Sequence, residues 1–177
     1  NKKDSTGICF IGERKFNDFI KQYLLAKPGE IVNEHGKTLG QHQGLIFYTI
    51  GQRQGLGIGG THHGEAPWFV AKKDLSNNTL VVVQGTEHPS LFTNHMIVSK
   101  IYWVDDNEPQ FPVTLTCKHR YRQPDQTCTI QKLDTDQYQI DFTQPQRAIT
   151  PGQSVVFYLN EECLGGGIIN RAFNKNN

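Results

Sequence analysis

The stretch VTLTCKHRYR, residues 113–122, carries the clearest strand pattern in the chain. Apolar residues alternate with polar ones along it, and successive side chains of a β-strand point to opposite faces. The side chains expected to face a core are Val113, Leu115 and Cys117. The pattern therefore predicts a half-buried strand whose exposed face carries Lys118, Arg120 and Arg122.

The exposed face of this strand places three cations in one strip. Alternate residues of a strand are roughly 7 Å apart, a spacing comparable to that of phosphates along an extended nucleic-acid strand. Tyr121, at the end of the stretch, could stack on a base where the strand twists. The strip allows two interpretations, a nucleic-acid contact or a solvated strand face that carries charge for solubility.

Further strand patterns surround this stretch. The candidate strands span residues 97–104, 127–133, 137–143, 154–159 and 164–170. Polar turn residues separate pairs of them, at residues 134–136 and 160–162. Short strands at this spacing predict a small closed barrel or a sandwich.

The N-terminal half combines one helix with a few strands. ERKFNDFIKQYL, residues 13–24, places apolar side chains on one face at helical spacing, and Pro28 follows as a stop signal. The strands expected here span residues 29–32, 68–71 and 80–83, the last two as a hairpin. Residues 42–50 remain open between helix and strand, and a domain boundary is expected near residues 85–95.

Composition limits the class of protein. Hydrophobic residues make up 36% and charged residues 20% of the 177 residues, as in a globular chain, and the net charge is only +1. A nucleic-acid contact must therefore come from a local patch. No apolar run is long enough to span a membrane and no signal peptide is visible, so we expect a cytoplasmic protein without a membrane partner. The start without methionine leads us to expect a piece of a longer protein.

The four cysteines are Cys9, Cys117, Cys128 and Cys163. No two of them form a C-x-x-C pair, and the histidines are scattered, so no metal site is expected. Three of the cysteines lie in or beside apolar, strand-like sequence, which is typical of small core residues. The exception is Cys9, which lies in DSTGICFIGERKF, residues 4–16, after a run of small polar residues.

The surroundings of Cys9 allow two interpretations. Small polar residues and glycine favour a mobile arm, and the N-terminus of the helix expected from about Glu13 lowers a thiol pKa where its geometry allows. Arg14 and Lys15 would add to that effect. The alternative is an ordinary loop in which Cys9 packs beside Phe10.

Two glycine clusters have different interpretations. Residues 55–60, GLGIGG, superficially resemble a dinucleotide-binding loop, but they lack the preceding strand, the following helix and the acidic residue of such a site. Residues 165–167, GGG, lie inside a strand pattern and predict a bulge or a tight barrel corner.

Taken in order, these segments resemble the bacterial tRNA-specific 2-thiouridylases, and DSTGICFIGERKF resembles the segment that carries their second catalytic cysteine. The other matching strings are TIGQRQGLGIGG (49–60), PWFV (67–70), VVVQGTEHP (81–89), RYRQ (120–123), TPGQSVVFY (150–158) and CLGGGII (163–169). The resemblance covers essentially the whole chain.

The resemblance implies a reaction and an architecture. These enzymes replace the 2-oxygen of the wobble uridine of tRNA with sulfur. ATP adenylates that oxygen, and a cysteine persulfide, loaded by a sulfur-donor or relay protein, then delivers the sulfur. The implied fold is mainly β with minor α: an arm over residues 1–12, a small central α+β domain over 13–92, and a C-terminal six-stranded antiparallel β-barrel over 93–173.

The resemblance also assigns site residues. Cys9 occupies the persulfide position, and Arg120, Tyr121 and Gln153 match positions at which the family touches tRNA. The ATP-pyrophosphatase domain, with its Ser-Gly-Gly-x-Asp-Ser loop and nucleophilic cysteine, has no counterpart in this sequence, so the 177 residues alone are expected to bind no ATP. The alternative function is a non-catalytic module that docks tRNA or a protein.

Overall fold

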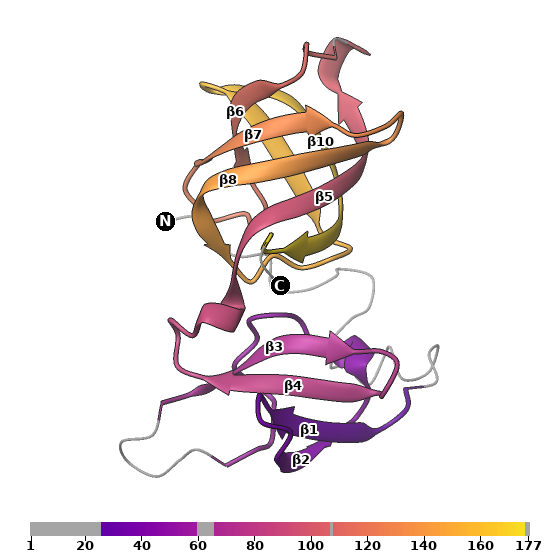
Figure 1. Cartoon of the computed structure of the whole chain (residues 1–177), viewed down its shortest axis with the longest axis vertical. Coiled ribbons are helices and arrows are strands. Elements are labelled where there is room, and N and C mark those ends of the chain that lie inside the picture. Colours follow the sequence, from indigo (N-terminus) through magenta and orange to yellow (C-terminus); the bar gives the residue numbers. More distant parts are fainter. Residues whose placement is uncertain (1–25, 60–65, 107, 176–177) are drawn as a thin grey trace, which may run out of the picture.

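The computed structural model describes residues 26–59, 66–106 and 108–175. It contains two β units, a four-stranded sheet from the N-terminal half and a closed six-stranded barrel from the C-terminal half. Figure 1 shows the barrel above the sheet, with the chain passing from one to the other at the start of β5 (Phe92–Trp103). The helix predicted over residues 13–24 lies outside the described residues.

The sheet has the strand order β2-β1-β4-β3. Its strands are β1 (Gly29–Asn33), β2 (Thr38–His42), β3 (Trp68–Asp74) and β4 (Thr79–Gln84). The pairs β1–β2 and β3–β4 are antiparallel, whereas β1 and β4 run parallel, so the sheet is mixed. The three strands predicted here are confirmed, including the β3–β4 hairpin. The second strand, β2, was not predicted.

The side chains of Asn33 and Asp74 stabilise the two hairpin turns of the sheet by hydrogen bonds to the backbone. Asn33 Oδ1 accepts from the backbone N–H groups of His35 and Lys37, at 3.1 and 2.8 Å, in the β1–β2 turn. Asp74 Oδ1 accepts from the N–H groups of Ser76 and Asn77, each at 3.1 Å, in the β3–β4 turn. Short side chains that bond to the backbone a few residues on are a common cause of tight turns.

The core of the sheet unit is completed by the segment between β2 and β3. The buried residues of this core are Ile31, Leu45, Tyr48, Leu56, Val70, Leu80 and Val82. The stretch over residues 42–50, open between helix and strand in the sequence, contains the end of β2 and a single 3-10 turn, η1 (Leu45–Phe47). That turn is too short to show a helical period in the sequence.

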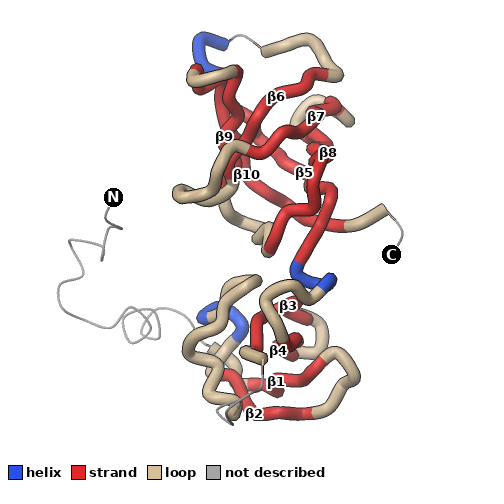
Figure 2. Tube along the Cα trace, turned by 90° about the vertical axis from the view of Figure 1, so that its left-hand side faces the viewer, coloured by secondary structure: helices blue, strands red, loops and turns tan. Residues whose placement is uncertain are grey.

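The barrel closes in the order β10-β5-β8-β7-β6-β9, and β10 pairs with β9. Its strands are β5, β6 (Val113–Lys118), β7 (Gln126–Lys132), β8 (Gln137–Arg147), β9 (Ser154–Leu159) and β10 (Glu162–Phe173), all antiparallel to their neighbours. Two short 3-10 turns, η2 (Pro89–Leu91) and η3 (Val104–Asp106), flank β5. The predicted six-stranded antiparallel barrel is confirmed, and the sandwich is excluded. Figure 2 shows the same two units from the side.

The alternating pattern of residues 113–117 places the expected side chains in the barrel core. Leu115, Cys117 and Cys128 are almost completely buried, as predicted. Cys163 was also predicted to be a core residue, and this is wrong because its side chain is exposed. It lies near the start of β10, opposite Tyr158, just before the strand shifts its register.

The glycine run of β10 allows the close approach that closes the barrel. A Cβ atom at Gly165 would lie 2.4 Å from the carbonyl oxygen of Tyr102 in β5. A Cβ atom at Gly166 would lie 2.7 Å from the carbonyl oxygen of Val155 in β9. Backbone atoms of both neighbouring strands occupy the space of a side chain, and the register shifts within this part of β10, as the predicted bulge requires.

Within the described ranges 26–59, 66–106 and 108–175, no helix has the length and apolar character needed to cross a membrane.

One buried residue of the barrel is a histidine whose ring makes no good hydrogen bond within the described residues. His119, the first residue after β6, is 4% exposed, and its ring packs edge-on against Phe142. Neither ring nitrogen makes a geometrically good hydrogen bond in the part of the chain that the structure describes, although the Gln146 side chain lies close enough to interact weakly with the ring. Burial, together with the positive charge of the adjacent Arg120, lowers the pKa of His119 to about 4.

We predict that His119 makes the fold less stable in mild acid. Unfolded His119 takes up a proton near its ordinary pKa of 6.5, whereas folded His119 does so only near 4. The free energy of unfolding is therefore undiminished above the pKa of His119 in the unfolded chain. It decreases as the pH falls from that value toward the pKa of His119 in the folded chain. The expected loss in free energy of unfolding across this window is on the order of 2 kcal/mol.

Urea titrations of the wild-type chain and of His119→Leu, at closely spaced pH values, measure this effect. The variant has no proton to bind at this position, so its stability should depend less steeply on pH in this window. Equal pH dependence of the two proteins would show that His119 is not responsible.

Candidate nucleic-acid interface

The basic stretch at the end of β6 leaves the strand earlier than predicted. β6 ends at Lys118, and residues 119–122 form a turn in which Gln123 N donates to Arg120 O at 3.2 Å. Gln123 Oε1 also accepts from His119 N, at 3.3 Å. The prediction of one strip of three cations along a strand face is therefore wrong, because two of the three lie in the turn.

Lys118 is held on the barrel wall by neighbouring side chains. Its ammonium group lies 3.1 Å from a carboxylate oxygen of Asp125 and 5.3 Å from the centre of the Tyr158 ring. An ion pair of this kind reduces the charge that Lys118 offers to a ligand. Among the predicted cations, Lys118 is therefore the one that the structure places on the strand rather than in the turn.

Arg120 joins the turn to another loop of the barrel. Its Nη2 donates to the carbonyl oxygen of Ala148 at 3.0 Å, so the turn over residues 119–122 is tied to the loop over residues 148–153. Partial burial and the charge of Arg147 lower the pKa of Arg120 from its ordinary value. A guanidinium group nevertheless stays charged near neutral pH.

Gln153 lies in the loop that Arg120 contacts. Its backbone is fixed, since its N–H donates to Thr150 O at 3.3 Å and its carbonyl accepts from Ile169 N at 2.8 Å, while its side chain is exposed. β6 and β9 run antiparallel with Lys118 opposite Val156, so the end of β6 and the start of β9 lie at the same end of the barrel.

The structure thus brings four predicted residues to one end of the barrel, the end nearest the sheet (Figure 1). Tyr121, in the turn, is 72% exposed, and Arg122 is exposed beside it. An exposed aromatic ring next to arginines has the side-chain types that stack on unpaired bases and bind phosphates. We call the four candidates at this end, Arg120, Tyr121, Arg122 and Gln153, the interface residues.

Ala148 connects this end of the barrel to the rest of the chain. Its N–H donates to Leu91 O in η2 at 2.6 Å, and its carbonyl accepts from Arg120 Nη2 and from Thr150 Oγ1. Its φ of 54° is in the left-handed region that alanine rarely adopts. Gly51, from the sheet unit, packs so closely that a Cβ atom there would lie 2.6 Å from the Ala148 Cβ.

A polar hollow of about 500 Å³ opens beside Arg120, and we call it the arginine hollow. Its lining residues are Phe92, His119, Arg120, Arg122, Gln123, Pro124, Gln126, Gln144, Pro145, Gln146 and Arg147. Three arginines line it, and no carboxylate is among its described lining residues. The electrostatic character of the arginine hollow therefore favours an anion.

A chain of glutamine amides gives the arginine hollow a fixed wall. Buried Gln146 accepts from Gln123 Nε2 at 2.7 Å and donates to Gln126 Oε1 and Gln144 O, each at 2.8 Å. Gln126 Nε2 in turn donates to Pro124 O at 3.0 Å. Because these amides bind one another, they hold the wall in place rather than pointing free groups at a ligand.

Arg147 was not predicted from the sequence. It ends β8, beyond Pro145, where the predicted strand over residues 137–143 had already stopped. Its Nε donates to Thr86 O at 3.1 Å, and its guanidinium lies 4.8 Å from the centre of the Phe69 ring, so it reaches from the barrel to the sheet unit. The signal available in the sequence was the acid-free cluster QPQR, residues 144–147.

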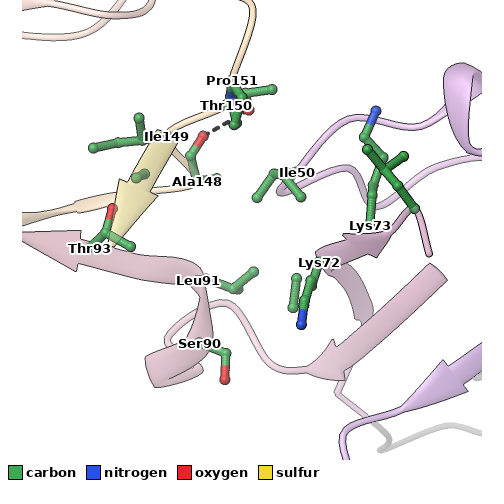
Figure 3. A pocket seen from close by; sticks show the side chains of 13 residues that line it. Ile50, Lys72, Lys73, Ser90, Leu91, Thr93, Ala148, Ile149, Thr150 and Pro151 are labelled. Carbon is green, nitrogen blue, oxygen red and sulfur yellow. Dashed lines mark hydrogen bonds between the residues drawn. The ribbon is translucent and has the colours of Figure 1, made fainter. Parts of the chain in front are cut away.

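A second hollow, of about 440 Å³, lies between the barrel and the sheet and is mostly apolar. Figure 3 shows Ile50 and Leu91 near its centre, with Ala148 to Pro151 on one side and Lys72 and Lys73 on the other. The ammonium of Lys73 donates to the carbonyl oxygens of Leu45 and Tyr48, at 3.2 and 2.7 Å. Lys73 therefore supports the loop of the sheet unit.

Two predictions about chemistry can be placed only in part. Cys9 lies outside the described residues, and its role stays a prediction. Over residues 26–59, 66–106 and 108–175, no three histidine, cysteine, aspartate or glutamate side chains are grouped so that they could hold a metal ion.

Two family models match the chain. The model described as "tRNA methyl transferase PRC-barrel domain" matches residues 17–84, and the one described as "Aminomethyltransferase beta-barrel domain" matches residues 93–169. The first match contains the four-stranded sheet, and the second covers most of the closed barrel.

Curated relatives match nearly the whole chain. A protein of Coxiella burnetii (strain RSA 493 / Nine Mile phase I) is 58% identical over 96% of this chain and 47% of its own length. One of Marinomonas sp. (strain MWYL1) is 57% identical over 99% of this chain and 45% of its own length. One of Pseudomonas fluorescens (strain SBW25) is 60% identical over 95% of this chain and 45% of its own length. All three are named tRNA-specific 2-thiouridylase MnmA. The chain, which spans about half the length of these relatives, therefore belongs to the tRNA-specific 2-thiouridylase family.

Proposed function

We propose that this chain carries the tRNA-docking surface and the sulfur-carrying cysteine of a cytoplasmic tRNA 2-thiouridylase. The observation that supports this most is the barrel end at which Arg120, Tyr121, Arg122 and Gln153 gather in a member of that family. Cationic and aromatic side chains at one exposed edge suit an RNA loop, whose bases are unpaired and whose phosphates are accessible. The substrate would be a tRNA that carries a wobble uridine.

In the proposed reaction, Cys9 is the sulfur carrier. A sulfur-donor or relay protein transfers a sulfane sulfur to the Cys9 thiolate, and the donor sulfur leaves as a thiolate. The resulting persulfide then forms a carbon–sulfur bond at C2 of the uridine, whose oxygen, activated by adenylation, leaves with AMP. A second cysteine thiolate attacks the Cys9 sulfur and breaks the sulfur–sulfur bond, so the sulfur stays on the base. The two cysteines are then joined by a disulfide, which a thiol reductant must reduce before the next turnover. A thiolate is the nucleophile that such transfers need.

The other half of the relatives' length is where we place the ATP chemistry. The chain spans about half of these proteins, and its sequence contains no Ser-Gly-Gly motif of the kind that the family uses to hold ATP phosphates. We therefore assign ATP binding, adenylation and the second cysteine to that other half. The tRNA contacts of the barrel and the persulfide of Cys9 can be tested without it.

The first prediction concerns Arg120. Arg120→Ala removes a charge from the proposed docking edge and should weaken tRNA binding by on the order of 1 to 2 kcal/mol, with a shallower salt dependence. Fluorescence anisotropy of a labelled tRNA transcript at several salt concentrations measures both quantities. Arg171→Ala is the matched control, since Arg171 is an exposed arginine on β10 that packs on Phe173 and is not one of the interface residues. Affinity and salt dependence that match the wild type would remove Arg120 from the interface.

The second prediction concerns Cys9. Incubation with a cysteine desulfurase and cysteine should add sulfane sulfur to the wild-type chain and none to Cys9→Ser, because a hydroxyl group forms no persulfide. Intact-protein mass spectrometry, with and without a reductant, detects the added sulfur. Cys163→Ser is the control, because Cys163 is an exposed thiol that the proposal leaves without a role. Sulfur that is retained by Cys9→Ser but lost from Cys163→Ser would show that Cys163, and not Cys9, is the carrier. A wild-type chain that retains no sulfur would favour a module that only docks tRNA or a protein.

A further inference from the structure

Two guanidinium groups converge on one point at the junction of the two units. A Cβ atom placed on Gly51 would lie 3.5 Å from Arg120 Nη2 and 3.6 Å from Arg147 Nη1. Arg120 comes from the turn after β6, Arg147 from the end of β8, and Gly51 from the segment between β2 and β3. Three segments that are distant in sequence therefore bring two like charges together.

This arrangement has no counter-charge in the described residues. Neither guanidinium lies within ion-pairing distance of a described carboxylate, and none of the described residues that line the arginine hollow is acidic. Like charges repel, and the repulsion is stronger where water is partly excluded. An anion between the two arginines would relieve it.

Donor atoms without partners belong to two of the side chains that line the arginine hollow. Arg147 Nη2 is buried and has no hydrogen-bond partner in the described part of the chain, and the ring nitrogens of His119 are buried with only a weak interaction with the Gln146 side chain. Both side chains line the arginine hollow, and His119 is 4% exposed. A neutral imidazole has one N–H donor, so the hollow is lined by two side chains that each have a buried donor without a good partner. Buried donors normally have partners, and this pair therefore indicates an acceptor that binds there.

The two units fix Arg147 from both sides. Its backbone belongs to the barrel, while its Nε binds Thr86 O and its planar group lies against the ring of Phe69 in β3. Arg120 is fixed by Ala148 O. A ligand held by both arginines would therefore meet donors that are already oriented, which is the arrangement in which planar guanidinium forks bind phosphate oxygens well.

We propose that Arg120, Arg147 and His119 bind one phosphodiester group of the tRNA backbone in the arginine hollow. The inference rests on the proposed function, since it takes tRNA as the ligand, and it adds Arg147 and His119 as binding residues. A phosphodiester provides two free oxygens and one negative charge, which match two guanidinium groups and a neutral imidazole N–H. Recognition of a base is disfavoured, since the glutamine amides of the wall bind one another.

Binding at this point has a consequence for the two units. Arg147 contacts the sheet unit, and Gly51 of that unit lies beside both arginines, so the phosphate is bound where barrel and sheet meet. The proposed contact is to the sugar-phosphate backbone of the RNA and carries no information about base sequence by itself. It would set the position of the RNA relative to the sheet unit.

The test compares Arg147→Gln, Arg147→Lys and the matched control Arg171→Gln in the whole chain. Binding of a labelled tRNA transcript is measured across a salt series, and circular dichroism checks the fold. Arg147→Gln should lose about tenfold in affinity at moderate salt, and the slope of log K against log salt should become shallower by about 0.7 to 0.9. Arg147→Lys should keep the wild-type slope with weaker binding, and Arg171→Gln should match the wild type.

A wild-type slope in Arg147→Gln would overturn the inference, because a purely structural role lowers stability without changing the number of neutralised phosphates. If Arg147→Gln does not fold, the Lys variant decides: wild-type affinity in Arg147→Lys would also overturn it. Stabilisation of the wild type by inorganic phosphate at constant ionic strength, with an unchanged tRNA slope in the Gln variant, would assign the hollow to a free anion instead. A wild-type chain that binds no tRNA would contradict both this inference and the proposed docking function. A wild-type salt slope in Arg147→Gln would contradict this inference alone and would leave the docking function standing.

Discussion

The backbone of Ala148 is the point on which the arrangement of this chain depends. Its N–H is bonded to Leu91 in the connection from the sheet, and its carbonyl receives Arg120 from the turn after β6. A left-handed backbone at a residue other than glycine costs on the order of 1 kcal/mol, and the surrounding contacts must hold it in place. Gly51 of the sheet unit packs on the same residue. The positions of the barrel end, of the turn after β6 and of the sheet loop therefore depend on one another.

The sequence predicted the parts of the fold that local pattern controls. Alternation over residues 113–118 and in the other barrel strands gave the barrel, since each strand has one face in the core. It did not show β2, whose TLGQH has a glycine and few apolar residues. It also extended β6 past Lys118, because a charged turn and a charged strand face have the same composition. β8 was predicted too short, since Pro145 interrupts the pattern after pairing with β7 has ended.

The candidate site was predictable only in the residues that carry chemistry by themselves. Arg120, Tyr121 and Arg122 are adjacent in the chain, so a basic and aromatic cluster was visible, and Gln153 came only from resemblance to a family. Arg147 and His119 gain their significance from buried side-chain nitrogen atoms that make no hydrogen bond within the described residues, and sequence does not reveal this property. With a net charge of +1, the proposed attraction of RNA must arise from such local convergence of cations.

Hydrogen exchange followed by mass spectrometry, with and without a tRNA transcript, tests the central claim that RNA docks at the barrel end built around Ala148. The account predicts slower exchange in peptides that cover residues 49–53, 119–123 and 148–153 together, because these three segments meet there. Slower exchange at η3 and in the turn between β7 and β8, with those three segments unchanged, would place the RNA elsewhere on the barrel and contradict the account.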